Sequence, residues 1–291
     1  MKTARRVVII ILLLISHCFN LLSQSGSVKV DLVSNGNKLN AKFYPVDRSI
    51  PSPTMILLHG FPGSDNNPLG LAEGLNQNGI NILVFNYQGT FRSEGVFNYD
   101  NCANDLVVAL DFLKQERNIK QFAIDTSRII ICGYSTGGSI ALTSAVHNPE
   151  IKNIIAIAAG NNKSFILNRM ADDPAYRTMF EKRITDLYSP KGPIKGDSIS
   201  LHNYFDEIIP DVNNDDLVLN ADKLKNRKIL FLTGWQDILS PMEEYIIPVY
   251  RKLKNLGSEC VAIKAFDTDH YFSNSKDELT NAITEWINKN I

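Results

Sequence analysis

The sequence predicts an α/β fold in which a mainly parallel β-sheet is flanked by helices and carries one inserted helical lid. Three observations lead to this prediction. Short apolar runs typical of buried strands alternate with segments whose apolar residues repeat at helical spacing. Several of these runs are almost continuously apolar, as is typical of parallel strands covered on both faces. The alternation is broken once, by a long polar stretch at 161–226.

The expected strands show two kinds of pattern. A turn-forming cluster at 34–37 separates two stretches, 27–33 and 39–44, in which apolar and polar residues largely alternate, and this predicts a β-hairpin. Mostly apolar runs then predict six buried strands, at 54–58, 80–87, 128–132, 153–159, 228–233 and 260–265.

Two helices have the clearest apolar stripes. The first stripe consists of Ala103, Leu106, Val107, Leu110 and Leu113. The second consists of Leu279, Ala282, Ile283, Trp286 and Ile287. Each stripe predicts a helix that packs one face against the sheet, so we expect these residues to belong to the core.

The polar stretch at 161–226 predicts a lid inserted between two core strands. Aromatic residues are scattered through it, and long structureless loops are uncommon in compact domains. We therefore expect a mostly helical segment over the site; a long irregular surface excursion is the alternative. This divides the folded chain into a core, at 26–160 and 227–291, and the lid.

Residues 1–25 have the pattern of an export signal. Lys2, Arg5 and Arg6 precede an unbroken apolar run at 7–15, and small residues near position 25 offer a cleavage site. The run is shorter than the ~20 residues that a membrane-spanning helix needs. We expect cleavage and export to the periplasm or the medium, without stable membrane insertion. An uncleaved signal that anchors the protein to a membrane is the alternative.

The charge balance argues against a nucleic-acid partner. The chain has 30 Lys and Arg residues, three of them in the expected signal, against 31 Asp and Glu residues. No strongly cationic face is implied, and nucleic-acid binding depends on one. We expect a small-molecule partner instead.

The cysteines predict neither a metal site nor a disulfide framework. Of the four, Cys18 lies in the expected signal. The remaining three form no CxxC pattern and no cluster with histidine. Cys132 and Cys260 lie in apolar runs, so we expect both to be buried free thiols.

The strongest chemical signal is the sequence Gly-Tyr-Ser-Thr-Gly at 133–137, which matches the G-x-S-x-G pattern. A buried strand is expected directly before it and a helix directly after it. A serine at such a tight turn takes strained backbone angles, and glycine on both sides removes side chains that would clash. The turn presents the Ser135 hydroxyl above the sheet beside backbone N–H groups of a helix N-terminus. We predict that Ser135 is a nucleophile.

A serine nucleophile needs a base and a carboxylate that orients it. Two of the five histidines follow an expected strand: His59 lies directly before Gly60, and His270 lies in the loop after the strand at 260–265, where a base can reach Ser135 over the carboxyl edge of the sheet. We expect His270 to be the base. Asp237 follows the strand at 228–233 and is the expected orienting carboxylate. Asp267 is the alternative, because it lies closer to His270 in the sequence.

An acyl-transfer site also needs donors for the developing oxyanion. The sequence His-Gly-Phe-Pro-Gly at 59–63 follows the strand at 54–58. Gly60 permits close approach of the backbone, while Pro62 has no N–H to donate. We expect the N–H groups of Phe61 and of Thr136, the residue after the nucleophile, to form the oxyanion hole.

The His-Gly loop, the Gly-x-Ser-x-Gly turn, the acid and the histidine occur in an order that resembles serine hydrolases of the α/β-hydrolase family. The segment 86–95 is similar to a loop of serine aminopeptidases and esterases, which usually have Arg where this chain has Gln88. The resemblance implies an acyl-enzyme mechanism without metal or organic cofactor. Ser135 attacks a carbonyl, and His270 takes its proton.

The resemblance favours hydrolysis of a carboxylic ester and leaves three alternatives. A peptidase or amidase uses the same three residues. Dehalogenases and epoxide hydrolases of this fold have aspartate at the nucleophile position, and Ser135 argues against them. A binding protein that retains the fold without catalysis is the third, because fold alone does not determine function.

Overall fold

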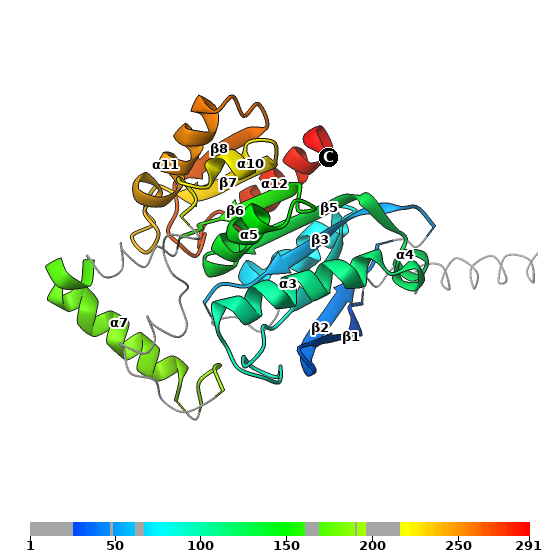
Figure 1. Ribbon diagram of the computed structural model, residues 1–291, viewed down its shortest axis with the longest axis horizontal. Coiled ribbons are helices and arrows are strands. Elements are labelled where there is room, and N and C mark those ends of the chain that lie inside the picture. The colour runs from blue at the N-terminus through cyan, green and yellow to red at the C-terminus, as the bar shows by residue number, and fades with distance from the viewer. Residues whose placement is uncertain (1–25, 47–48, 62–66, 161–168, 190, 196–215) are drawn as a thin grey trace, which may run out of the picture.

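The computed structural model describes residues 26–46, 49–61, 67–160, 169–189, 191–195 and 216–291 (Figure 1). Within them, one eight-stranded sheet has the order β1-β2-β4-β3-β5-β6-β7-β8. The strands are β1 (Val28–Ser34), β2 (Asn37–Tyr44), β3 (Ser52–Leu58), β4 (Asn81–Phe85), β5 (Ile124–Tyr134), β6 (Asn153–Ile157), β7 (Lys228–Gly234) and β8 (Val261–Phe266). Every expected strand is present, with ends that differ by a few residues.

The sheet is parallel except at one edge. The hairpin β1–β2 is antiparallel, and β2 also pairs antiparallel with β4. All pairs from β4 through β3 to β8 are parallel. The carboxyl ends of the parallel strands therefore meet at one edge, where loops from distant parts of the sequence converge. The predicted fold class is confirmed.

Helices cover both faces of the sheet. The described helices are η1 (Pro68–Gly70), α2 (Leu71–Gln77), α3 (Tyr99–Lys114), α4 (Glu116–Phe122), α5 (Thr136–His147), α7 (Pro174–Leu187), α10 (Ala221–Leu224), α11 (Met242–Asn255) and α12 (Lys276–Asn290). Buried residues of α2 and α12 form one apolar cluster with the sheet. Those of α3, α5, α10 and α11 form the larger cluster on the other face.

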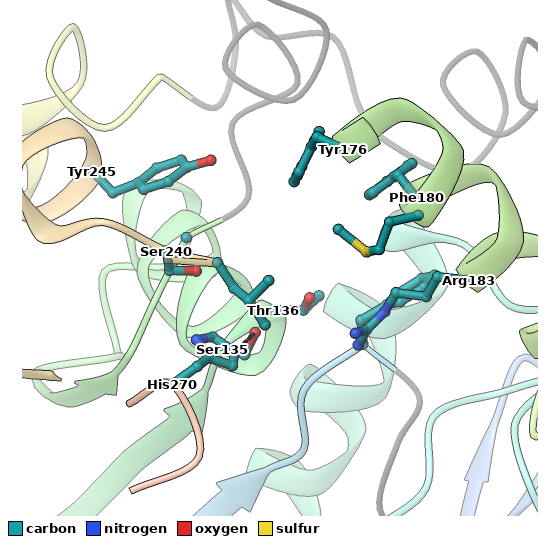
Figure 2. Close-up of a pocket in the computed structure, with 12 residues that line it drawn as sticks. Ser135, Thr136, Tyr176, Phe180, Arg183, Ser240, Tyr245 and His270 are labelled. Carbon is teal, nitrogen blue, oxygen red and sulfur yellow. Dashed lines mark hydrogen bonds between the residues drawn. The ribbon is translucent and has the colours of Figure 1, made fainter. Parts of the chain in front are cut away.

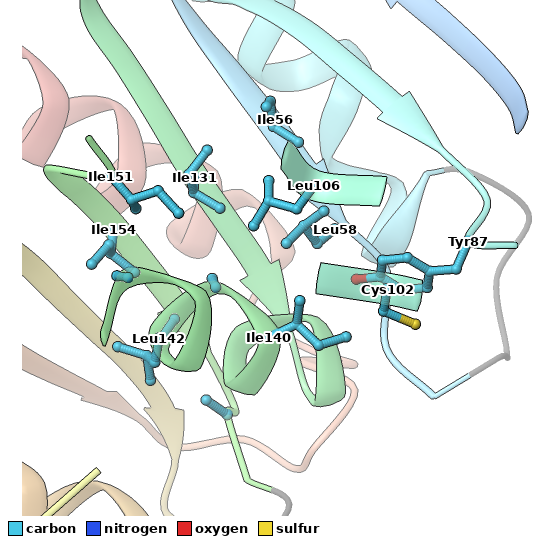
Figure 3. Packing of buried hydrophobic residues seen from close by; sticks show 14 of the residues in the cluster. Ile56, Leu58, Tyr87, Cys102, Leu106, Ile131, Ile140, Leu142, Ile151 and Ile154 are labelled. Atoms are coloured by element: carbon cyan, nitrogen blue, oxygen red, sulfur yellow. The ribbon is translucent and has the colours of Figure 1, made fainter. Parts of the chain in front are cut away.

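Alternation along the strands supplies both clusters. In β3, Ile56 and Leu58 belong to the larger cluster, whereas Met55 and Leu57 belong to the smaller one, because successive side chains of a strand point to opposite faces. Figure 3 shows Leu106 of α3 and Ile140 of α5 packed over the strands on the face of the sheet that carries the larger cluster. Burial of both faces explains why the central strands are almost continuously apolar.

Two expectations about single residues were wrong. Val107 is 41% exposed, because the buried stripe of α3 runs through Cys102, Leu106 and Leu110, and a neighbouring helical position is rotated by about 100°. Cys260 is exposed, unlike Cys132. It precedes the first residue of β8 and lies in the connection that leads into that strand, outside the sheet.

The predicted lid at 161–226 is described only in part. Its main described element is α7, which Figure 1 shows apart from the sheet. Near its end, α10 buries Ala221 and Leu224 in the larger core cluster. Residues 161–168, 190 and 196–215, among them His202, lie outside the described residues. The division into core and lid therefore stays a prediction. Among the described residues, no helix has the length and apolar character needed to cross a membrane; the expected signal lies outside them.

Candidate active site

Ser135 lies at a strained turn between β5 and α5. Its backbone angles are φ 53° and ψ −121°, a conformation that costs a non-glycine residue about 1–3 kcal/mol and that clusters at functional sites. Two glycines make the turn possible. A Cβ on Gly133 would lie 2.1 Å from the Gly137 carbonyl oxygen, and a Cβ on Gly137 would lie 2.6 Å from the Leu58 carbonyl oxygen. The Ser135 N–H donates to the Ile157 carbonyl at 2.7 Å, which ties the turn to β6.

The structure brings the three predicted residues into one hydrogen-bonded chain. His270 Nδ1 lies 2.8 Å from Asp237 Oδ2, and His270 Nε2 lies 3.1 Å from Ser135 Oγ. Because a carboxylate only accepts hydrogen bonds, the proton of a neutral imidazole belongs on Nδ1, which leaves Nε2 to accept from the serine hydroxyl. Figure 2 shows Ser135 and His270 side by side at the base of a pocket.

Asp237, and not Asp267, is the carboxylate that contacts the histidine. It is buried, and its Oδ1 accepts from the N–H groups of Leu239 and Ser240 at 2.9 and 2.8 Å. Asp267 is exposed and accepts from the Gln236 side chain at 2.8 Å. The loops after β7 and β8 approach each other closely, since a Cβ on Gly234 would lie 2.3 Å from the Thr268 carbonyl oxygen.

The loop after β3 approaches the serine from the other side. A Cβ on Gly60 would lie 3.1 Å from the Ser135 Cβ, so glycine lets the backbone pass close to the nucleophile. Phe61 and Thr136 both line the pocket beside Ser135. The N–H of Thr136 opens α5, where the first N–H groups have no intrahelical acceptor. Both expected oxyanion residues are therefore beside the serine.

His59 supports this loop, a role that the sequence reasoning missed. The side chain is fully buried, and its Nδ1 lies 2.8 Å from the Gly60 carbonyl oxygen. Its Nε2 faces the Tyr87 N–H at 3.4 Å. A neutral imidazole with its proton on Nδ1 satisfies both contacts. The position of His59 directly before Gly60 was the only signal for this role.

A cavity of about 80 Å³ opens beside Ser135. Its described lining residues are Phe61, Ser135, Thr136, Gly160, Tyr176, Met179, Phe180, Arg183, Leu239, Ser240, Tyr245 and His270. Four of these come from one face of α7, and Figure 2 shows three of them, Tyr176, Phe180 and Arg183, opposite the serine and histidine. Sequence reasoning expected aromatic residues in this segment but assigned none of them to the site.

Gln88 lies away from the cavity and joins a buried polar network. Its side chain donates to Asp105 Oδ1 at 2.6 Å and to Ser34 Oγ at 3.1 Å, and its oxygen accepts from Asn37 at 2.9 Å. Its backbone N–H donates to Asp105 Oδ2 at 2.7 Å. The network joins the β1–β2 hairpin, the loop after β4 and α3. In this chain, Gln88 therefore links the segment 86–95, which resembles the esterase loop, to α3 and to the β1–β2 hairpin.

Asp105 should make the stability of the fold depend on pH. The carboxyl is fully buried, and no described cation pairs with it. Burial raises its pKa above the ordinary 3.8, against the hydrogen bonds from Gln88 and Ser34 that lower it. The native state then binds the carboxyl proton of Asp105 more tightly than the unfolded chain does. The contribution of Asp105 to the free energy of unfolding is therefore largest below the ordinary pKa, and it declines as pH rises through the raised pKa.

We expect Asp105→Asn to remove this decline. Chemical denaturation of the wild-type protein and of the variant between pH 3.5 and 7 measures the decline, because it gives the free energy of unfolding at each pH. Any loss of hydrogen bonds lowers the stability of the variant by a similar amount at every pH. Parallel pH profiles for the two proteins would contradict the prediction.

Comparisons with known proteins place the chain in a family. A model of the alpha/beta hydrolase fold matches residues 53–255. The esterase Pf2001 of Pyrococcus furiosus has a similar structure, with a TM-score of 0.67, 18% identity and 91% coverage of each chain. The structure of Est1E from Butyrivibrio proteoclasticus with bound ferulic acid gives a TM-score of 0.62 at 19% identity, over 89% of this chain and 98% of that one. The uncharacterized protein YfhR of Salmonella typhi is 24% identical over 211 residues, 66% of this chain and 68% of that protein.

These similarities define the class of protein. The family model spans well over half of the chain, and the sheet and its covering helices agree with it. The chain belongs to the α/β-hydrolase family, as the sequence resemblance predicted. The likeness to the solved esterases, at under 25% identity, concerns the fold, and family membership supports a hydrolase.

Proposed function

We propose that the protein is a serine hydrolase that cleaves a carboxylic ester through an acyl-enzyme. The observation that carries this proposal is the chain of contacts from Asp237 through His270 to Ser135, at 2.8 and 3.1 Å. Few arrangements other than nucleophilic catalysis explain a strained serine that faces a buried His–Asp pair. Esterase structures among the similar folds favour an ester as the substrate.

The mechanism follows from the geometry. Ser135 Oγ attacks the ester carbonyl carbon while His270 Nε2 accepts the hydroxyl proton. The carbonyl oxygen becomes an oxyanion that accepts from the N–H groups of Phe61 and Thr136. The alcohol leaves with the proton from His270, and water then attacks the acyl-enzyme with the same base.

The surroundings of His270 suit this role. Buried Asp237 holds the Nδ1 proton and stabilises the imidazolium that forms during attack. Burial raises the pKa of the Tyr134 phenol, with nearby Tyr271 and Asp237 adding to the effect. The phenol therefore stays neutral, and its O–H donates to the His270 carbonyl at 3.2 Å, which helps to fix the histidine loop.

An ester and amide pair tests the proposal. Wild-type protein is expected to hydrolyse 4-nitrophenyl acetate in preference to 4-nitroacetanilide, and Ser135→Ala is expected to lose both activities. Preference for the anilide would favour the peptidase or amidase alternative. A folded protein that turns over neither compound, nor longer acyl esters, would favour the non-catalytic binding protein.

We also propose that the protein is exported after cleavage near residue 25, on the basis of the basic start and apolar run of residues 1–15. The first residue of the protein recovered after expression in a bacterial host tests this. An N-terminus near position 26 in the periplasm or medium is the expected result. Intact Met1 in the membrane fraction would favour the uncleaved anchor.

A further inference from the structure

We propose that Arg183 is a binding residue for an anionic group, so that the physiological substrate is an ester bearing a carboxylate at a distance from the bond that is cleaved. The inference rests on the proposed ester hydrolysis at Ser135 and names the class of substrate. Arg183 lies on α7 and lines the cavity on the side opposite the serine and histidine (Figure 2).

The face of α7 that carries Arg183 points into the cavity. Tyr176, Met179, Phe180 and Arg183 all line it, and their spacing places them on one face of a helix. Tyr176 and Phe180 are buried, and their rings stack at 6.1 Å between centroids. Arg183 thus continues an otherwise apolar face of the helix, where its side chain is partly buried.

The cationic side chains of α7 lie on two different faces of the helix. On the exposed face, Arg177 pairs with Glu181 at 2.9 Å and Lys182 pairs with Asp186 at 2.6 Å. Arg183 forms no ion pair with a described acid. Its recorded contact is with the Phe61 ring, 5.9 Å from the guanidinium carbon, a distance at which a cation–π contact is weak. Within the described part of the chain, the guanidinium donors therefore face no competing carboxylate.

None of the described lining residues of the cavity carries a charge that would compete for the anion. Among its described lining residues, Arg183 is the only one with a fixed charge, and none is Asp or Glu. The nearby Asp237 carboxylate is buried against His270 and backbone N–H groups. A guanidinium binds a planar carboxylate with paired, charge-assisted hydrogen bonds.

The position of Arg183 specifies where the anion lies. The guanidinium lies near Phe61, whose N–H is a proposed oxyanion donor, and across the cavity from His270 (Figure 2). A carboxylate bound there is separated from the reacting carbonyl by an apolar stretch that contacts Phe180 and Met179. The structure thus favours an ester with an apolar or aromatic body and a remote carboxylate.

Matched substrates test the inference. One pair is 4-nitrophenyl monoadipate and its terminal carboxamide, which places the charge on the acyl side. The other pair is 4-carboxyphenyl acetate and 4-carbamoylphenyl acetate, which places it on the leaving group. In at least one pair we expect wild-type kcat/KM to favour the carboxylate by about 10- to 100-fold, mainly through KM. Rates with Ser135→Ala give the uncatalysed background.

Variants on the same helix assign the preference to Arg183. Arg183→Met is expected to remove the preference, and Arg183→Lys to retain part of it, since the charge stays but the paired hydrogen bonds do not. Lys182→Met removes one charge from the exposed face of α7 and should leave the preference unchanged. Circular dichroism melting confirms that each variant is folded.

The outcomes separate this inference from the proposed function. Hydrolysis of the neutral esters without any carboxylate preference would overturn the inference and leave the serine hydrolase standing. A preference that survives in Arg183→Met, or an equal loss of kcat on charged and neutral esters in that variant, would also overturn it. Absence of hydrolysis for all four esters in folded wild-type protein would contradict the proposed function itself.

Discussion

Replacing Ser135 by alanine is expected to lower kcat for ester hydrolysis by about 10⁵- to 10⁶-fold, because the variant has no nucleophile. His270→Ala should cost nearly as much, since the serine is then without its base and the two residues act as a unit. Steady-state hydrolysis of 4-nitrophenyl acetate measures both losses. The double variant should be little worse than either single variant.

The substitution Ser139→Ala is the control that tests whether a change in this part of the chain disturbs folding. Ser139→Ala lies one turn further along α5, away from the described cavity lining, and should retain wild-type activity. Ser135→Ala keeps the strained backbone of its position and should unfold at about the wild-type temperature. A loss of activity in Ser139→Ala equal to that in Ser135→Ala would point to damage of the helix instead of loss of the nucleophile.

Asp237→Asn should lower kcat by about 10⁴-fold with little effect on folding. The asparagine side chain can turn its NH2 group toward His270 Nδ1, which then has to accept. The imidazole proton then lies on Nε2. This nitrogen can no longer accept the serine hydroxyl proton. Activity of the purified variant on the same ester measures this loss.

Asp267→Asn is the matched control for Asp237→Asn. Asp267 is the same residue type, lies closer to His270 in the sequence and is exposed, with its carboxylate on Gln236. The variant should retain most of the activity. If Asp267→Asn lost activity while Asp237→Asn kept it, the assignment of the orienting carboxylate would be wrong.

Local sequence was enough to predict the sheet and the position of Ser135. The runs that form β3, β5, β6 and β7 are apolar because both of their faces are buried, so their composition alone identifies them. Gly133 is required by a contact within the turn itself, and Gly137 is required because a Cβ there would meet the Leu58 carbonyl oxygen at the end of β3. Asp237 and His270 could be placed at the carboxyl edge of the sheet because each of them follows an expected strand.

Contacts between segments that are distant in the chain could not be predicted from these local patterns. Arg183 is one of several cations on a polar helix, and only the docking of α7 beside Phe61 distinguishes it from Arg177. The network of Gln88 and Asp105 joins segments far apart in the chain. Burial of single residues also depends on exact packing, as the exposure of Val107 shows.

The most direct test of the central claim is covalent labelling with a fluorophosphonate probe, read by intact mass and peptide mapping. We expect one adduct on wild-type protein, located on Ser135, and none on Ser135→Ala. His270→Ala should label far more slowly, because the hydroxyl then has no base. A well-folded wild-type protein that stays unlabelled, or an adduct on another residue that persists in Ser135→Ala, would contradict the claim that Ser135 is an activated nucleophile.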